Sequence, residues 1–433
     1  MNTTSKLLTL LCAVAFMPAC GGASKTSGAG MSGLAADAPP PPGGENVKLD
    51  RNVSRATEKG FASAVKYFQD QAKAGWTDAT CNEASQKFVT IAEGSKKMVE
   101  ARFNAGLALQ ACDMNKEAED HYQKALKINP GHAESLSNLG EIYFKGGNEA
   151  RAKQYWTQAV TANGKVVAAR NNLAWLDIRS IRDGKASLKS LESGIKSNLS
   201  SALAVDNDNV EAYTLYGLLY MQQGTKRNKS RLTLAKLLLE KGEEIDANYA
   251  PLHNAKGLLL LQQDNVPKAL ISFRRAVQLN PNFLEAHRNL GNIVLDFRKY
   301  DEAKAEFDIV LKLNSKDYDA RIGLGYALRG LKQYDQAEAA YKAAIKIDKA
   351  RPEADYNLGV LYQDFRSSAT DDLKEAQSAF REAAKYFKSA MSKPTATSQL
   401  KKDAADNIKT CEKNVKNLDM AIDFQKQNNA ATP

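Results

Sequence analysis

The sequence predicts an all-α protein, built as a solenoid of about eight helix-turn-helix repeats with capping helices at both ends. The first observation is a period of 34 residues, which relates residues 250–283, 284–317 and 318–351. The second is that apolar residues in each window recur every three or four positions, as they do on one face of a helix. The third is that alternating β-branched runs are scarce throughout the 433 residues. The chain is therefore expected to stack helices rather than to pair strands.

Each window joins two helices through small side chains. In the first window, Gly257 lies on the first helix, and Ala269 and Ala276 lie on the second. Small residues at these positions let the two backbones approach closely, and the bulky Phe273 fills the space that remains. Pro281 ends the second helix because proline disfavours helical geometry in the residue before it. One such hairpin cannot bury its own apolar faces, so the copies must stack.

This pattern resembles the tetratricopeptide repeat (TPR), and the resemblance covers about 290 residues. It implies a superhelical solenoid in which the first helices line a concave, ligand-binding face. We expect residues 51–98 to form a degenerate helical cap repeat, residues 99–391 the solenoid, and residues 392–433 a C-terminal capping helix and tail. The repeat at residues 167–209 is nine residues longer than the others, and we expect its second helix to take up the difference.

The N-terminus has the features of a secretion signal. Lys6 precedes an apolar run of eleven residues, which is too short to cross a bilayer as a helix. The residues before Gly21 resemble the bacterial lipobox, which implies that residues 1–19 are a lipoprotein signal peptide and that Cys20 carries the lipid. The alternative is an ordinary cleaved signal peptide without a lipid.

The residues after Cys20 bear on where the chain is held. Gly21 in place of aspartate resembles the sorting pattern of outer-membrane lipoproteins, which implies a lipid-anchored protein on the periplasmic side of the outer membrane, with surface exposure left open. Residues 20–50 contain the lipidated cysteine and a flexible tether rich in glycine and proline, which cannot form a core.

The formal net charge of +10 could favour an acidic partner, but the basic residues are spread along the chain and are mostly interleaved with acidic ones. We therefore expect no nucleic-acid ligand. One basic segment stands out, and it is either a solvated insertion or a contact for acidic lipid or an acidic subunit: Lys226, Arg227, Lys229 and Arg231.

The cysteines and histidines point to structure rather than chemistry. Cys81 and Cys112 fall near each other in stacked hairpins, so an oxidising compartment predicts a disulfide between them, and the alternative is a pair of half-buried thiols. Cys411 is expected to pack on the apolar face of the last helix. His253 and His287 occupy the same repeat position in adjacent repeats, which is too far apart for one metal ion, so we expect them to fill the core.

The sequence contains no phosphate-cradling glycine loop and no HExxH, CxxC or GxSxG motif. Its carboxylates lie mostly on the outward faces of the expected helices, whereas acid–base catalysis needs titratable groups that converge in a pocket. We therefore expect no enzymatic activity, no cofactor, no metal site and no small-molecule substrate.

The TPR resemblance implies that ligands contact fixed positions of the first helices. A pair of lysines that would clamp a chaperone's C-terminal carboxylate is not evident at these positions. Placed on this sequence, the positions give an apolar and aromatic lining with a few polar members: Phe103, Leu107, Phe144, Trp175, Leu218, Met221, Leu258, Leu261, Arg288, Asn292, Tyr326, Arg329 and Tyr356.

The resemblance to outer-membrane TPR lipoproteins implies a non-catalytic scaffold for protein–protein interactions that docks components of an envelope machinery. Its partners would be envelope proteins, with the membrane reached through the lipidated cysteine. Gliding motility is the first candidate machinery. Two alternatives are an assembly factor, similar to a pilotin, for a pilus, secretion or polysaccharide export, and a carrier of a hydrophobic or glycan ligand in the groove.

Overall fold

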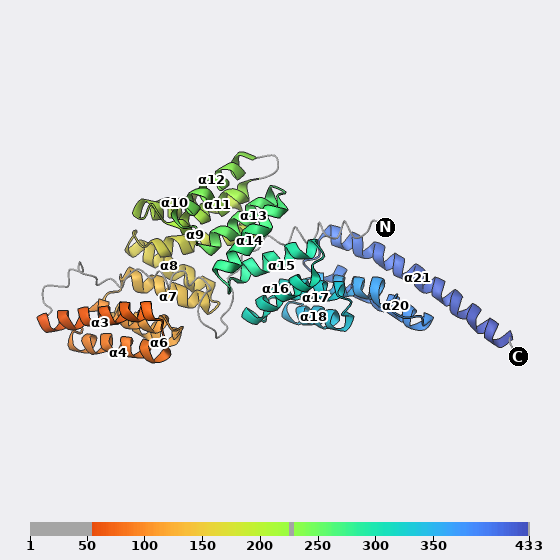
Figure 1. The fold of residues 1–433 in the computed structure, drawn as a ribbon, viewed down its shortest axis with the longest axis horizontal. Helices are drawn as coiled ribbons and strands as arrows, with labels where there is room; N and C mark the ends of the chain where they lie inside the picture. Colours follow the sequence, from red (N-terminus) through yellow and green to blue (C-terminus); the bar gives the residue numbers. More distant parts are fainter. Residues whose placement is uncertain (1–53, 225–228, 432–433) are drawn as a thin grey trace. The chain divides into compact units, whose positions relative to one another are not determined.

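The computed structural model describes residues 54–224 and 229–431, and these are helical with no strand among them. The all-α fold class is thereby confirmed. The expected signal peptide, Cys20 and the tether lie outside the described residues, as do Lys226 and Arg227. The described residues divide into two units, residues 54–286 and 287–431, and each unit is a run of packed helices (Figure 1).

The first unit is a series of helical hairpins, in which each helix packs against the next one along the chain (Figure 1). Its helices are α3 (Arg55–Ala74), α4 (Asp78–Gly94), α5 (Val99–Gln110), α6 (Asn115–Ile128), α7 (Ala133–Lys145), α8 (Glu149–Ala162), α9 (Val167–Arg182), α10 (Leu188–Val205), α11 (Val210–Gln223), α12 (Lys229–Ile245), α13 (Ala250–Gln262) and α14 (Val266–Leu279).

The boundary between the units falls within α15 (Leu284–Asp296), and the second unit continues the hairpin pattern. Its last helix is much longer than the others and packs along the helix before it. The remaining elements are α16 (Tyr300–Leu313), α17 (Tyr318–Gly330), α18 (Tyr334–Ile347), α19 (Glu353–Val360), the π-helical turn η1 (Leu361–Arg366), α20 (Leu373–Ser392) and α21 (Ser398–Ala431).

The predicted pairing of a small residue with a bulky one holds each hairpin together. A Cβ atom added to Gly140 would lie 2.4 Å from the indole nitrogen of Trp156, and one added to Gly325 would lie 2.4 Å from the Tyr341 ring. Both aromatic side chains are fully buried. Glycine is therefore required at these positions because the aromatic ring of the second helix occupies the volume that any side chain would need.

In six of the described hairpins, which lie between α5 and α18, the turn that follows the first helix passes through one residue with positive φ. This residue is glycine in two hairpins, with φ of 80° at Gly147 and 69° at Gly184. The next amide bonds back across the turn, as from the Asn148 amide to the Tyr143 carbonyl at 2.8 Å, which satisfies a carbonyl at the helix end. In four other hairpins a larger residue adopts the same left-handed conformation: Asp113, Asp264, Arg298 and Lys332.

The nine extra residues of the long repeat are not all in its second helix, so that prediction is wrong. Helix α9 has 16 residues and α10 has 18, compared with 13 and 14 in the regular pair α13 and α14. The turn between α9 and α10 is longer as well. The insertion is thus shared between both helices and their turn, and α9 and α10 still pack against each other.

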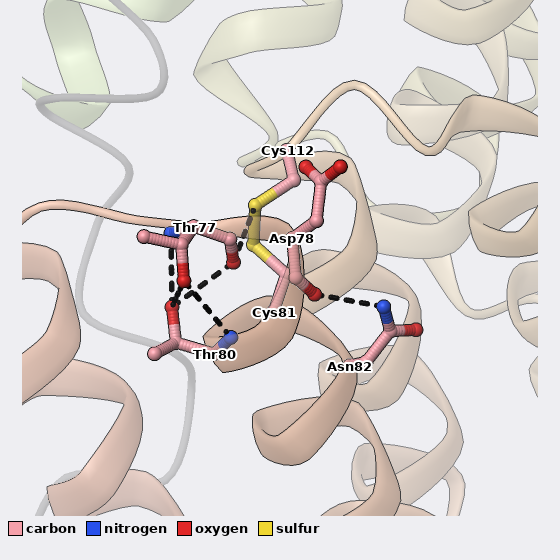
Figure 2. Close-up of a disulfide and its surroundings, with 6 residues drawn as sticks. All are labelled: Thr77, Asp78, Thr80, Cys81, Asn82 and Cys112. Atoms are coloured by element: carbon pink, nitrogen blue, oxygen red, sulfur yellow. Dashed lines mark hydrogen bonds between the residues drawn. A yellow bond between two sulfur atoms is a disulfide. The ribbon is translucent and has the colours of Figure 1, made fainter.

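A disulfide joins Cys81 and Cys112, whose Cα atoms are 6.3 Å apart (Figure 2). Cys81 lies in the first turn of α4, and Cys112 lies in the turn after α5. Helix α4 begins with a capping box, in which the Thr77 side chain accepts from the Thr80 amide and the Thr80 side chain accepts from the Thr77 amide. The bond therefore links the hairpin of α3 and α4 covalently to the next one.

The two histidines at equivalent repeat positions are core residues, as expected. His253 is 7% exposed, and its ring shares a hydrogen bond of 2.8 Å with the Ala247 carbonyl. His287 is 5% exposed and lies 2.6 Å from a Glu306 carboxylate oxygen. None of the helices in the described part of the chain has both the length and the apolar character that a membrane span requires.

Candidate functional site

The first helices of the repeats carry the predicted ligand-binding residues, and the structure divides these residues into two groups. Six are partly exposed: Leu107, Trp175, Leu218, Leu261, Asn292 and Tyr326. The other seven are buried: Phe103, Phe144, Met221, Leu258, Arg288, Arg329 and Tyr356. The surface available to a partner is therefore narrower than the repeat register implied.

Two of the buried residues show why the register overestimated the exposed face. Phe103 packs on the Tyr122 ring of its own hairpin at 5.7 Å and on the ring of His132, the N-cap of α7, at 5.2 Å. Tyr356 packs on Phe387 at 5.3 Å and accepts a hydrogen bond from the Asn407 amide of α21. The C-terminal helix thus covers the first helix of the last repeat, where the repeat pattern predicted a ligand-binding residue.

An aromatic and cationic cluster lies between α7 and α9, and we call Phe144, Trp175, Arg179 and Glu149 the Trp175 cluster. The rings of Phe144 and Trp175 meet edge-on at 5.2 Å. The Arg179 guanidinium stacks 4.6 Å from the Trp175 ring centre, and it also pairs with the half-exposed carboxylate of Glu149. Ring stacking and the ion pair hold the partly exposed indole of Trp175 in one orientation.

Polar side chains continue the same face from α9 to α11. The Asn171 amide nitrogen donates to the side-chain oxygen of Asn209 and to the Glu211 carboxylate, both at 2.9 Å. Burial raises the pKa of Glu211, and the nearby charge of Glu141 acts in the same direction, while the bond from Asn171 opposes them. This part of the face holds a carboxylate that is costly to ionise.

Replacing Glu211 with glutamine is expected to stabilise the protein at neutral pH. The folded protein holds the Glu211 proton more tightly than the unfolded chain does, so stability falls as pH rises from the ordinary glutamate pKa through the raised one. The free energy of unfolding of the Glu211→Gln variant should not decrease with rising pH over this range. The comparison is with Glu244→Gln, a change at an exposed residue, and equal pH profiles for the two variants would contradict the assignment.

The second unit has a smaller cluster around Tyr326. The Arg329 guanidinium lies 4.5 Å from the Tyr326 ring centre and 5.3 Å from that of Phe365, which belongs to η1. Elsewhere in the unit, Arg288 and Asp317 form an ion pair in which both side chains are nearly inaccessible to water. These arginines serve packing and charge pairing inside the unit, while the Tyr326 ring remains partly exposed.

Arg179 and Glu211 contribute to the face, but sequence reasoning did not select either of them. Arg179 lies four residues after Trp175, which places the two side chains on one helix face, and this spacing was the available signal. Glu211 had no comparable signal because its hydrogen-bond partner Asn171 lies 40 residues earlier, in the preceding repeat.

Models of a known repeat family match part of this chain. Models of the tetratricopeptide repeat match residues 99–132, 121–154, 254–303 and 288–355. A human IFIT1 dimer with PPP-AAAA has a similar fold, with a TM-score of 0.52 and 19% identity over 77% of this chain and 83% of that one. At this identity the likeness concerns the fold alone.

Two curated relatives match shorter stretches. The probable UDP-N-acetylglucosamine–peptide N-acetylglucosaminyltransferase SPINDLY of Hordeum vulgare is 30% identical over 143 residues, which is 32% of this chain and 15% of that protein. The photosystem I assembly protein Ycf3 of Rippkaea orientalis is 29% identical over 102 residues, 22% of this chain and 59% of that protein. The chain thus spans less than two thirds of either relative. The matched segments therefore show tetratricopeptide repeats within residues 99–154 and 254–355 of this chain.

Proposed function

We propose that this protein is a non-catalytic scaffold that binds a polypeptide partner on the first-helix face of its N-terminal unit. The observation that carries the proposal is the Trp175 cluster, in which a tryptophan and an arginine are held rigidly at a partly exposed position. Tryptophan and arginine are the residue types most enriched where truncation costs the most binding energy. Tetratricopeptide repeats are in general protein-interaction modules, which supports a protein ligand.

The cluster favours a partner segment with an apolar side chain that covers the indole of Trp175. Groups beside this side chain would accept hydrogen bonds from the Arg179 guanidinium. Leu107, Leu218 and Leu261 are also partly exposed at corresponding positions of other first helices. Because the scaffold helices do not have to order on binding, little conformational entropy opposes association on the scaffold side.

Replacing Trp175 with glutamate should weaken capture of protein partners from solubilised envelopes by at least about thirtyfold, the effect of losing a central binding residue. The matched control is Ile271→Glu, which introduces the same charge at an apolar side chain that is 67% exposed on the second helix α14. Circular dichroism should show both variants folded. If the two variants capture partners equally well, the assignment of the binding face is wrong.

We further propose that the scaffold works in the bacterial envelope, anchored through a lipid on Cys20 to the periplasmic side of the outer membrane. The lipobox resemblance supports the anchor, and the disulfide between Cys81 and Cys112 supports an oxidising compartment. Its partners would then be proteins of an envelope machinery, with gliding motility as the first candidate.

A Cys20→Ala variant tests the anchor without disturbing the repeats. It should leave the membrane fraction and appear in the soluble fraction, since the attached acyl chains supply the binding energy. A Cys12→Ala variant, changed within the expected signal peptide, should remain with the membrane. The lipid assignment fails if both variants sediment with the membrane.

A role as an assembly factor is the second candidate, and the similarity to the assembly protein Ycf3 favours it. Such a factor would hold subunits only until a complex is complete. Stoichiometric capture from mature envelopes supports the permanent scaffold, whereas capture confined to newly synthesised subunits supports the assembly factor.

A further inference from the structure

A basic hollow lies where α4, α5 and α6 meet, away from the Trp175 cluster. It has a volume of about 350 Å³ and is open to solvent. Four cationic side chains line it: Lys96 from the turn between α4 and α5, Arg102 from α5, and Lys124 and Lys127 from α6. Ala92 and Ile128 contribute apolar surface, and Glu93 is the acidic member. The cations exceed the carboxylates by three in this space.

Three of the four cations that line the hollow have no carboxylate partner in the described part of the chain. Among the described residues, no carboxylate lies within ion-pair distance of Lys96, Arg102 or Lys127, and Lys124 alone pairs, with Asp120. By contrast, Arg182, Arg288, Arg351 and Arg366 each pair with at least one carboxylate. The fold thus gathers cations here from three separate segments, and the carboxylates beside them neutralise only part of the positive charge.

We propose that this hollow binds a phosphate monoester, with Arg102 and the three lysines on the phosphate oxygens. A guanidinium offers a planar pair of donors that matches two phosphate oxygens, and ammonium groups add donors that adapt to the remaining oxygens. Ala92 and Ile128 provide apolar surface for the organic part of the ester. A dianion suits the site better than a carboxylate because it neutralises more of the excess charge.

The phosphate could belong to a soluble molecule or to a lipid headgroup, and the shared chemistry is the terminal phosphate. His121 offers a spectroscopic probe of both. Burial lowers the pKa of His121, the charges of Lys124 and Arg102 act in the same direction, and Asp120 opposes them. A bound dianion between these cations should raise the pKa of His121, because it favours the imidazolium form.

The experiment compares three full-length proteins that all carry Cys20→Ala, so that acyl chains cannot hold them on vesicles. One has no further change, one has Lys96→Gln, Arg102→Gln and Lys127→Gln, and the control has Lys59→Gln, Lys189→Gln and Lys268→Gln. The control removes the same charge at exposed lysines of the same unit. Histidine resonances are followed during titration with inorganic phosphate at constant ionic strength, with His253 as an internal reference.

Vesicle sedimentation forms the second arm, using phosphatidylcholine with and without phosphatidate. The parent and control proteins should show saturable phosphate binding that shifts His121 alone, and the hollow variant should bind about tenfold more weakly for each cation removed. Binding to phosphatidate vesicles without a response to free phosphate assigns the headgroup as the source. If the hollow and control variants behave alike in both arms, the proposal is overturned and the cluster is a solvated surface. The single change Lys96→Gln, in an exposed turn, should show a partial loss even if the triple variant does not fold.

Discussion

Replacing Trp156 with alanine is expected to lower the free energy of unfolding of its hairpin by about 3–5 kcal/mol, the cost of truncating a fully buried aromatic side chain. The Trp156 ring fills the space against Gly140 and is fully inaccessible to water. Its indole nitrogen also donates to the Ser137 carbonyl at 3.0 Å, so truncation removes this hydrogen bond as well. Hydrogen exchange of the amides in α7 and α8 measures the loss locally.

Trp175→Ala serves as the matched control, since it removes the same side chain from a partly exposed position one repeat later. Its destabilisation should be less than half that of Trp156→Ala, while its effect on partner capture should be much larger. A Trp156→Ala variant that loses less than about 1 kcal/mol would show that the hairpin does not depend on this ring.

Replacing Arg288 with methionine is expected to destabilise the C-terminal unit by about 3–5 kcal/mol, because it leaves a buried carboxylate without its cation. Asp317 is 7% exposed and Arg288 is 4% exposed, so water cannot replace the lost partner. Asp317 also accepts from the Ala320 amide at the start of α17, which fixes its position. The unfolding midpoint in urea, followed by circular dichroism, should fall accordingly.

A second substitution separates the stranded charge from lost packing. Asp317→Asn added to Arg288→Met keeps the cap acceptor but removes the charge, so the double variant should regain much of the lost stability. Lys304→Met is the control, since it breaks an exposed pair with Asp308 on one helix and should cost less than about 0.5 kcal/mol. Equal losses in the single and double variants would contradict a charge-based effect.

The sequence predicted the hairpins well because their packing depends on residues that lie close together along the chain. Gly140 and Trp156 are sixteen residues apart, and the same small and bulky pair returns in other repeats as Gly257 with Phe273 and as Gly325 with Tyr341. Both residues of such a contact lie within a single repeat. For this reason the repeat pattern indicated both the helices and the side chains that join them.

The binding face was harder to predict because exposure depends on what packs from elsewhere. Tyr356 occupies a repeat position that lines the face, but α21 returns from about fifty residues away to cover it. Phe103 likewise packs against His132, at the start of the next hairpin. The register of a repeat gives the direction in which a side chain points, whereas its solvent exposure is decided by neighbours that the period does not encode.

The left-handed turns after the first helices bear on how readily single hairpins open. Arg298 and Lys332 adopt positive φ without being glycine, with values of 57° and 61°. Side chains in this conformation cost about 1–2 kcal/mol per residue. Neighbouring hairpins supply the compensating stability, so each such turn leaves its hairpin closer to local opening than a glycine turn would. With a turn of this kind, the two helices of one hairpin can separate briefly while the rest of the array stays folded.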